Sequence, residues 1–140
     1  MIKVELSRIS GDFHLEAVND NGNSLTIDAS PEIGGTNKGM RPMQLLLAAM
    51  GGCSSIDVIS ILKKQKQELK DIKITVTGER EKDAVPSLYN EVHVHFKLYG
   101  NLDQDKVQKA VSLSVEKYCS VAKTLEPTAK VTYGFEIIGI

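Results

Sequence analysis

Alternating apolar and polar residues open the chain and predict a series of short strands. In segment 2–9 the apolar Ile2, Val4 and Leu6 alternate with polar residues, and Phe13, Leu15 and Ala17 continue the pattern. Such alternation is typical of a strand with one buried face. Residues 19–23 are rich in Asn and Gly, which tolerate positive φ and favour a tight turn, and residues 25–27 mark a third strand. The sequence therefore predicts an N-terminal antiparallel meander.

The second half of the chain repeats this alternation in three further places. Residues 72–76 and 92–98 alternate apolar with polar side chains, and the polar, proline-containing segment 81–90 between them is suited to a hairpin loop. Residues 131–137 alternate in the same way near the end of the chain. We expect a hairpin followed, after an intervening helix, by one more strand.

A long apolar segment between these two groups of strands predicts a buried helix. Residues 30–41 hold a proline, three glycines and scattered polar groups, so we expect a loop there. Pro42 suits the first turn of a helix, and residues 42–62 are of helix length with Asp57 as their only charge. A helix that is apolar all round is a buried one, and a chain this small hardly buries it alone. We therefore expect a dimer that shares this core.

A second helix is predicted between the hairpin and the last strand. Asn101 or Asp103 is suited to cap it, and Pro127 lies just past its end. Its apolar stripe advances in steps of three and four and comprises Val107, Val111, Val115, Tyr118, Ala122 and Leu125. The predicted order is βββ-α-ββ-α-β, an α+β fold in a single domain over residues 1–140.

Composition and charge narrow the class of protein. The 17 basic and 18 acidic residues leave a net charge of −1, which gives no electrostatic signature for nucleic acid or an anionic membrane. Segment 43–62 contains Gln44, three serines and Asp57, so we expect a poor membrane span. With no secretory signal before the first strand and only two cysteines, we expect a cytoplasmic protein.

Cys53 is the strongest candidate for chemistry because two glycines directly precede it inside the long helix. Each of Gly51 and Gly52 costs about 1 kcal/mol in a helix relative to alanine. Three explanations stay open: a kink, a close helix crossing, or backbone that admits a ligand beside Cys53. A break would place Cys53 at a helix N-terminus, where the dipole favours a thiolate. The alternative is a small buried side chain with no chemistry.

Cys119 borders the apolar stripe of the second helix, and packing explains that position without chemistry. The alternative is a resolving thiol that captures an oxidised Cys53 as a disulfide, since a sulfenic acid condenses with a nearby thiol. No metal-ligand spacing such as C-x-x-C occurs. His93 and His95 share one side of their strand, and a solvated sheet face explains them better than a metal site. We expect neither a metal nor an organic cofactor.

Two motifs identify a family resemblance. Residues 41–62 (RPMQLLLAAMGGCSSIDVISIL) closely resemble the first cysteine motif of the OsmC/Ohr family, and residues 116–121 (EKYCSV) resemble the second. The combination is most similar to the YhfA-like branch. The resemblance implies an intertwined homodimer in which each sheet wraps the partner's central helix. It also implies that Cys53 attacks organic hydroperoxides, that Cys119 resolves, and that a dithiol or lipoylated protein is the reductant.

The sequence departs from the peroxidase branches at two positions. Those branches carry a Glu directly after the Pro that opens the central helix, where this chain has Met43, with Gln44 adjacent. They also carry an early Arg after a glycine pair, which the segment 10–13 lacks; nothing maps Arg8 or Arg41 onto that role. Without these partners we expect a thiol-dependent peroxidase of modest efficiency. The alternative is a non-enzymatic binding protein for a hydrophobic or acyl ligand.

Overall fold

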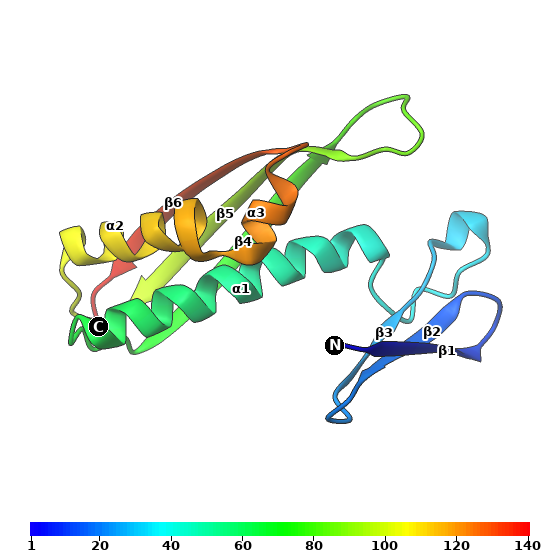
Figure 1. Cartoon of the computed structure of the whole chain (residues 1–140), viewed down its shortest axis with the longest axis horizontal. Coiled ribbons are helices and arrows are strands. Elements are labelled where there is room, and N and C mark those ends of the chain that lie inside the picture. Colours follow the sequence, from blue (N-terminus) through cyan, green and yellow to red (C-terminus); the bar gives the residue numbers. More distant parts are fainter. The chain divides into compact units, whose positions relative to one another are not determined.

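The computed structural model describes all residues, 1–140, which form two compact units: residues 1–46 and residues 47–140 (Figure 1). The prediction of a single domain over residues 1–140 stays a prediction. In chain order the elements are β1 (Val4–Ser10), β2 (His14–Asn19), β3 (Ser24–Ile27), a 3₁₀ turn η1 (Pro31–Ile33), α1 (Pro42–Lys64), β4 (Asp71–Arg80), β5 (Tyr89–Tyr99), α2 (Gln104–Leu113), a π-helical turn η2 (Ser114–Tyr118), α3 (Ser120–Leu125) and β6 (Lys130–Ile138). This order confirms the predicted α+β class.

The first unit contains the predicted antiparallel meander. Its sheet has the order β1-β2-β3, with both neighbouring pairs antiparallel. The turn between β2 and β3 places Gly22 at φ 84°, a conformation that glycine adopts without strain. The Asn19 side chain accepts hydrogen bonds from the backbone N–H groups of Asn21 and Asn23. The Asn and Gly residues that predicted this turn therefore also stabilise it.

A buried carboxylate organises the segment that the sequence predicts as a loop. Asp28 accepts hydrogen bonds from the Thr36 hydroxyl at 2.6 Å and from the backbone N–H groups of Ala29, Thr36 and Lys38. The Thr36 hydroxyl is the main cause that lowers the pKa of Asp28 from 3.8 to about 2. The segment also contains the short turn η1. Asp28 thus holds an irregular segment in one conformation.

The second unit is a sheet of order β4-β5-β6 packed against helices. β4 pairs antiparallel with β5, as predicted for the hairpin, and β6 pairs parallel with β5. A parallel pair requires a crossover, which α2, η2 and α3 supply. The face of β5 that is turned toward the helices is fully buried and consists of Val92, Val94, Phe96 and Leu98. The core of the second unit therefore lies between this sheet and the helices that run along it (Figure 1).

Helix α1 confirms the long helix predicted from Pro42, and its glycine pair does not break it. A Cβ at Gly51 would lie 3.0 Å from Cγ2 of Val76 and 3.6 Å from Cγ2 of Ile74, whereas a Cβ at Gly52 would meet nothing within 4 Å. Gly51 is therefore explained by a close approach of strand β4, and not by the helix crossing that the sequence suggested. The dipole-activated Cys53 that a break would create is absent from this structure.

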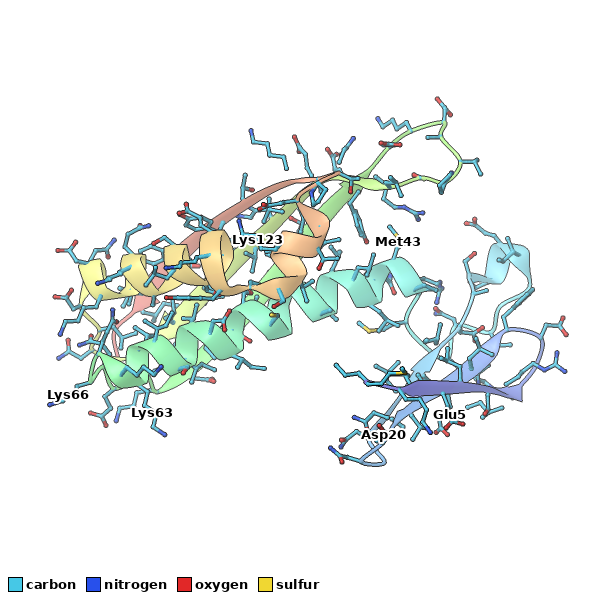
Figure 2. All side chains as sticks on the ribbon, viewed as in Figure 1. Glu5, Asp20, Met43, Lys63, Lys66 and Lys123 are labelled. Atoms are coloured by element: carbon cyan, nitrogen blue, oxygen red, sulfur yellow. The ribbon has the colours of Figure 1, made fainter.

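Only one stripe of α1 is buried within the chain. The buried stripe comprises Met50, Gly51, Ser54, Val58 and Leu62. Ile56 and Ile59 on the other side of the helix are exposed, and so is Leu46 near its start. By length and mean hydropathy, 1.9, α1 would pass as a membrane span, but the core helix of a soluble protein has the same properties. Figure 2 shows Lys63 and Lys66 at the opposite end of α1 from Met43. Basic residues in the last turn, such as Lys63, interact favourably with the helix dipole.

The prediction of one continuous second helix through residue 125 is wrong. Helix α2 begins as predicted, with the Asp103 carboxylate accepting from the backbone N–H of Lys106 at 3.0 Å. After Leu113 the helix widens into the π-turn η2, closed by the hydrogen bond from Cys119 N–H to the Ser114 carbonyl at 2.7 Å. Cys119 itself is extended, at φ −72° and ψ 106°, and begins α3. The prediction that Tyr118 belongs to the buried stripe is also wrong: Tyr118 is exposed and Cys119 is buried in its place, because the π-turn adds one residue to the helical repeat. Val107, Val111, Val115 and Ala122 are buried as predicted.

Candidate functional site

The structure brings Cys53 and Cys119 (the cysteine pair) together from segments 66 residues apart in the chain. Cys53 lies in the middle of α1 and is partly exposed, whereas Cys119 is fully buried at the start of α3. Both are free thiols, and the two side chains lie close enough for Cys53 to raise the pKa of Cys119. Only one thiol of the pair reaches solvent, so an incoming molecule meets Cys53 first.

The environment of Cys119 keeps this thiol protonated. The pKa of Cys119 is raised from 9.0 to about 11, mainly by burial and in part by the nearby Cys53 side chain. The backbone N–H of Ala122 opposes this change by donating to the Cys119 sulfur at 3.4 Å. At neutral pH Cys119 is therefore a neutral thiol that can act as a hydrogen-bond donor toward Cys53.

A set of polar contacts fixes the segments that carry the two cysteines. The buried Ser114 hydroxyl lies 3.0 Å from the Ser54 carbonyl oxygen and 3.2 Å from the Asp57 carboxylate, both on α1. On the other side of η2, the Tyr133 hydroxyl donates to the Glu116 carboxylate at 2.6 Å and ties the turn to β6. The π-turn that precedes Cys119 is therefore held both to α1 and to the sheet.

The surface beside Cys53 is apolar. Ala49 lies one helical turn before Cys53, and Ile56 lies one turn after it, so both are on its side of the helix. Ala49, Gly52 and Ile56 are exposed, and Ile56 retains 69% of its accessible surface. This arrangement favours contact between Cys53 and a molecule with an aliphatic part.

The residues near the start of α1 serve local structure. The Gln44 side chain accepts from the backbone N–H of Arg41 at 2.9 Å, and the Arg41 guanidinium donates to the Gly39 carbonyl and the Asn37 side chain. Met43 stands in the first turn of the helix. The groups that shift the pKa of Cys119, apart from burial itself, are Cys53 and the backbone N–H groups of Val121 and Ala122, and none of them is cationic.

His93 and His95 lie on the sheet face opposite the helices, as expected for a solvated face. His93 pairs with the Thr132 hydroxyl at 2.7 Å and His95 with Glu136 at 3.3 Å. A shallow cavity of about 170 Å³ on this face is lined by Thr77, Gly78, Glu79, Glu91, His93, Lys130 and Thr132. No group of three or more His, Cys, Asp or Glu side chains could hold a metal ion.

Sequence reasoning missed the contributions of Ser114, Glu116 and Tyr133, and it assigned no role to Asp57. One signal was present for Ser114: a serine lies between Val111 and Val115, at a position where the periodicity predicts burial. A buried hydroxyl needs a hydrogen-bond partner, which predicts a contact with another element. The identity of that partner depends on the tertiary structure.

A buried cysteine on a crossover, in contact with a partly exposed cysteine on a central apolar helix, defines an α+β protein with a prearranged thiol pair. Residues 35–134 match the family model described as OsmC-like protein, and the chain belongs to this family. It is 43% identical to protein YhfA of Escherichia coli strain K12 over 103 residues. The aligned region covers 73% of this chain and 76% of YhfA.

Solved structures share the fold over nearly the whole chain. A hypothetical protein from Aquifex aeolicus VF5 is 34% identical, with a TM-score of 0.85 over 100% of this chain and 98% of that one. An organic hydroperoxide resistance protein OsmC from Legionella pneumophila is 17% identical, with a TM-score of 0.73 over 97% of this chain and 96% of that one. The second likeness concerns the fold alone.

Proposed function

We propose that this protein reduces organic hydroperoxides with the cysteine pair and so contributes to defence against oxidative stress. The observation that carries the proposal is the contact between a solvent-reaching Cys53 and a buried, protonated Cys119. This is the arrangement that a two-cysteine peroxidase needs, with one thiol open to the substrate and a second thiol waiting beside it.

The proposed cycle has three steps. The Cys53 thiolate attacks the terminal oxygen of the hydroperoxide, the O–O bond breaks, and the alkoxide takes up a proton to leave as an alcohol. The Cys119 sulfur then attacks the resulting Cys53 sulfenic acid; an S–S bond forms, and hydroxide leaves as water with the Cys119 proton. An external dithiol, free or on a lipoylated protein, reduces the disulfide by thiol–disulfide exchange.

A homodimer is part of the proposal because the single chain leaves apolar surface uncovered. Leu46, Ile56 and Ile59 on α1 are exposed, and the sheet of the first unit exposes further aliphatic side chains, among them Val4 and Leu6. A three-stranded sheet needs a packed face for stability. We propose that a second copy covers these surfaces, that the protein is cytoplasmic, and that it has neither a nucleic-acid nor a membrane partner.

The substrate class follows from the surface beside Cys53. Ala49 and Gly52 offer apolar contacts to an alkyl or aryl group but few polar contacts to water or hydrogen peroxide, whereas Ile56 belongs to the surface that the second copy covers. The family supports this choice, because solved relatives from Legionella pneumophila and Elizabethkingia anophelis are described as organic hydroperoxide resistance proteins. We therefore propose a preference for organic hydroperoxides over hydrogen peroxide.

The expected efficiency is modest. Met43 occupies the position of a Glu in the peroxidase branches, and Arg41 binds the Gly39 carbonyl and Asn37 within its own loop. An arginine beside a reactive cysteine stabilises the thiolate and attracts the peroxide. A chain without that contact reacts more slowly.

A second candidate function rests on the same apolar surface. The exposed side chains next to Cys53 would also suit a fatty acyl or similar hydrophobic ligand. An apolar Met43 favours such a ligand more than a charged residue at that position would. In this case the cysteine pair would need no reactivity. Native mass spectrometry of the purified protein distinguishes the candidates, since a co-purified lipid supports the binding protein and an empty protein that forms a disulfide supports the enzyme.

Stopped-flow kinetics test the proposed activity. Reduced protein is mixed with cumene hydroperoxide or hydrogen peroxide, with Cys53→Ser and Cys119→Ser measured in parallel. We expect Cys53-dependent consumption of cumene hydroperoxide that is faster than with a free thiol, slower consumption of hydrogen peroxide, and an accumulated sulfenic acid in Cys119→Ser. Consumption that is unchanged in Cys53→Ser, or no faster than with a free thiol, would contradict the proposal.

A further inference from the structure

Ser114 connects the two segments that carry the cysteine pair. Its hydroxyl is fully buried and lies 3.0 Å from the carbonyl oxygen of Ser54, the residue directly after Cys53. Its own carbonyl accepts the backbone N–H of Cys119 at 2.7 Å. A path of two hydrogen bonds through one residue therefore joins the backbone next to Cys53 to the backbone of Cys119.

The same hydroxyl has a second acceptor on α1. The Asp57 carboxylate lies 3.2 Å away, one helical turn after Cys53, so the single hydroxyl proton is shared between two acceptors. Val111 and Val115 beside Ser114 are buried, and an apolar residue would fill this place without the need for partners. A buried hydroxyl is tolerated only when it is hydrogen-bonded, so we attribute the serine at this position to the hydrogen bonds that link η2 to α1.

The local backbone gives this link a specific target. The π-turn η2 adds one residue to the helical repeat, and Cys119 leaves the helix in an extended conformation with its sulfur turned to Cys53 and to Ala122 N–H. A π-turn is less favourable than regular helix and needs support from its surroundings. Ser114, which both opens the turn and accepts its closing hydrogen bond, supplies that support from α1.

We propose that Ser114 is a positioning residue that holds Cys119 in reach of Cys53 and thereby sets the stability and the rate of formation of the Cys53–Cys119 disulfide. The inference deepens the proposed function and rests on it for its biological meaning. In the step concerned, the Cys119 sulfur attacks the Cys53 sulfenic acid, an S–S bond forms, the S–O bond breaks, and hydroxide leaves as water with the Cys119 proton. Ser114 supplies no proton and acts only through geometry.

The expected effects concern the disulfide and leave the first reaction of Cys53 unchanged. A disulfide requires a narrow range of Cβ–Cβ separations, and thiols held in contact reach it with little movement. Without the Ser114 hydroxyl the turn samples wider geometries, so we expect an equilibrium constant for disulfide formation about tenfold lower, equal to about 30 mV in the two-electron potential. We expect the resolution step to slow by a similar factor.

Ser114→Ala and Ser112→Ala form a matched pair for the test. The Ser112 hydroxyl donates at 3.2 Å to the Lys109 carbonyl of its own helix and touches neither cysteine segment. Each variant is equilibrated with mixtures of reduced and oxidised dithiothreitol, and the oxidised fraction is read from alkylation and mass spectrometry. Separate stopped-flow experiments with cumene hydroperoxide measure the formation and the decay of the sulfenic acid.

Two variants at Asp57 keep the test valid if Ser114→Ala fails to fold. Asp57→Ala removes one acceptor of the Ser114 hydroxyl, whereas Asp57→Asn keeps a carbonyl acceptor and removes only the charge. We expect a smaller shift of the same sign in Asp57→Ala and recovery in Asp57→Asn. If both Asp57 variants have the wild-type equilibrium constant for disulfide formation, the inference is overturned.

The outcomes separate this inference from the proposed function. Ser112→Ala should match the wild type, and Ser114→Ala should form a less stable disulfide at an unchanged rate of sulfenic acid formation. A Ser114→Ala protein with the wild-type equilibrium and resolution rate would overturn the role of Ser114 while leaving the peroxidase intact. If the wild-type protein does not react with hydroperoxide but its disulfide equilibrium still depends on Ser114, the proposed peroxidase activity is refuted and the inference is retained. If Cys53 and Cys119 form no disulfide at any ratio of oxidised to reduced dithiothreitol, the inference is overturned.

Discussion

Replacement of Ile56 by lysine should weaken the proposed dimer strongly. Ile56 lies on the uncovered side of α1 and keeps 69% of its surface exposed in the single chain. Full burial of an isoleucine contributes about 1.5–3 kcal/mol, so cover of the remaining two thirds contributes about 1–2 kcal/mol per chain. Because a symmetric dimer contains the position twice, the loss amounts to about 2–4 kcal/mol before any cost of desolvating the new ammonium group.

This loss corresponds to a dissociation constant about 30- to 700-fold higher, which sedimentation equilibrium over a range of protein concentrations can measure. Ile140→Lys is the matched control, since it is the same substitution at a position that keeps 75% of its surface exposed near the end of the chain. We expect wild-type association in the control. Equal dissociation constants for wild type and Ile56→Lys would place the interface elsewhere, and a monomeric wild type would refute the dimer.

Three further predictions follow from single residues. Burial raises the pKa of Cys119 from 9.0 to about 11, so the folded protein retains a proton that the unfolded chain releases. The free energy of unfolding, measured by urea titration, should therefore fall between pH 9 and pH 11, and Cys119→Ala should remove this dependence. The Thr36 hydroxyl holds the pKa of Asp28 at about 2, below 3.8, so the stability that Asp28 contributes is lost as the pH falls from about 4 to 2; in Thr36→Val, the Asp28 carboxyl titration followed by NMR should move up toward 3.8, and an unchanged midpoint would contradict the assigned cause. Gly51→Val should cost about 1–3 kcal/mol in urea unfolding because a Cβ there lies 3.0 Å from Val76 Cγ2, and an unchanged stability would mean that β4 yields freely.

The parts of the fold that local sequence determines could be predicted. The alternation in residues 92–98 produces β5 with a buried face, and Pro42 followed by an apolar run produces α1. Asp103 caps α2 because its carboxylate reaches the N–H of a residue three positions later. These features depend on residues that are neighbours in the chain.

The parts that depend on distant residues could not be predicted. The break at Cys119 follows from a turn that Ser114 holds to α1, and the reason for Gly51 is a strand that comes later in the chain. The role of Asp28 depends on the fold of residues 29–38 around it. Apolar periodicity reports burial but does not report which element supplies the partner.

The candidate site shows the same division. The motifs around Cys53 and Cys119 were recognisable, and the structure places the two thiols in contact. The polar framework around them, Ser114 with Asp57 and Glu116 with Tyr133, joins segments that sequence spacing does not relate. Its detection needed the tertiary structure.

The central claim is that Cys53 and Cys119 act as one redox pair toward an organic hydroperoxide. The most direct measurement adds one equivalent of cumene hydroperoxide to the fully reduced protein and maps the products by mass spectrometry without a reductant. We predict the loss of two hydrogen atoms from the protein, a peptide pair linked through Cys53 and Cys119, and one equivalent of cumyl alcohol. A protein that keeps both thiols free while the hydroperoxide remains unconsumed would contradict it.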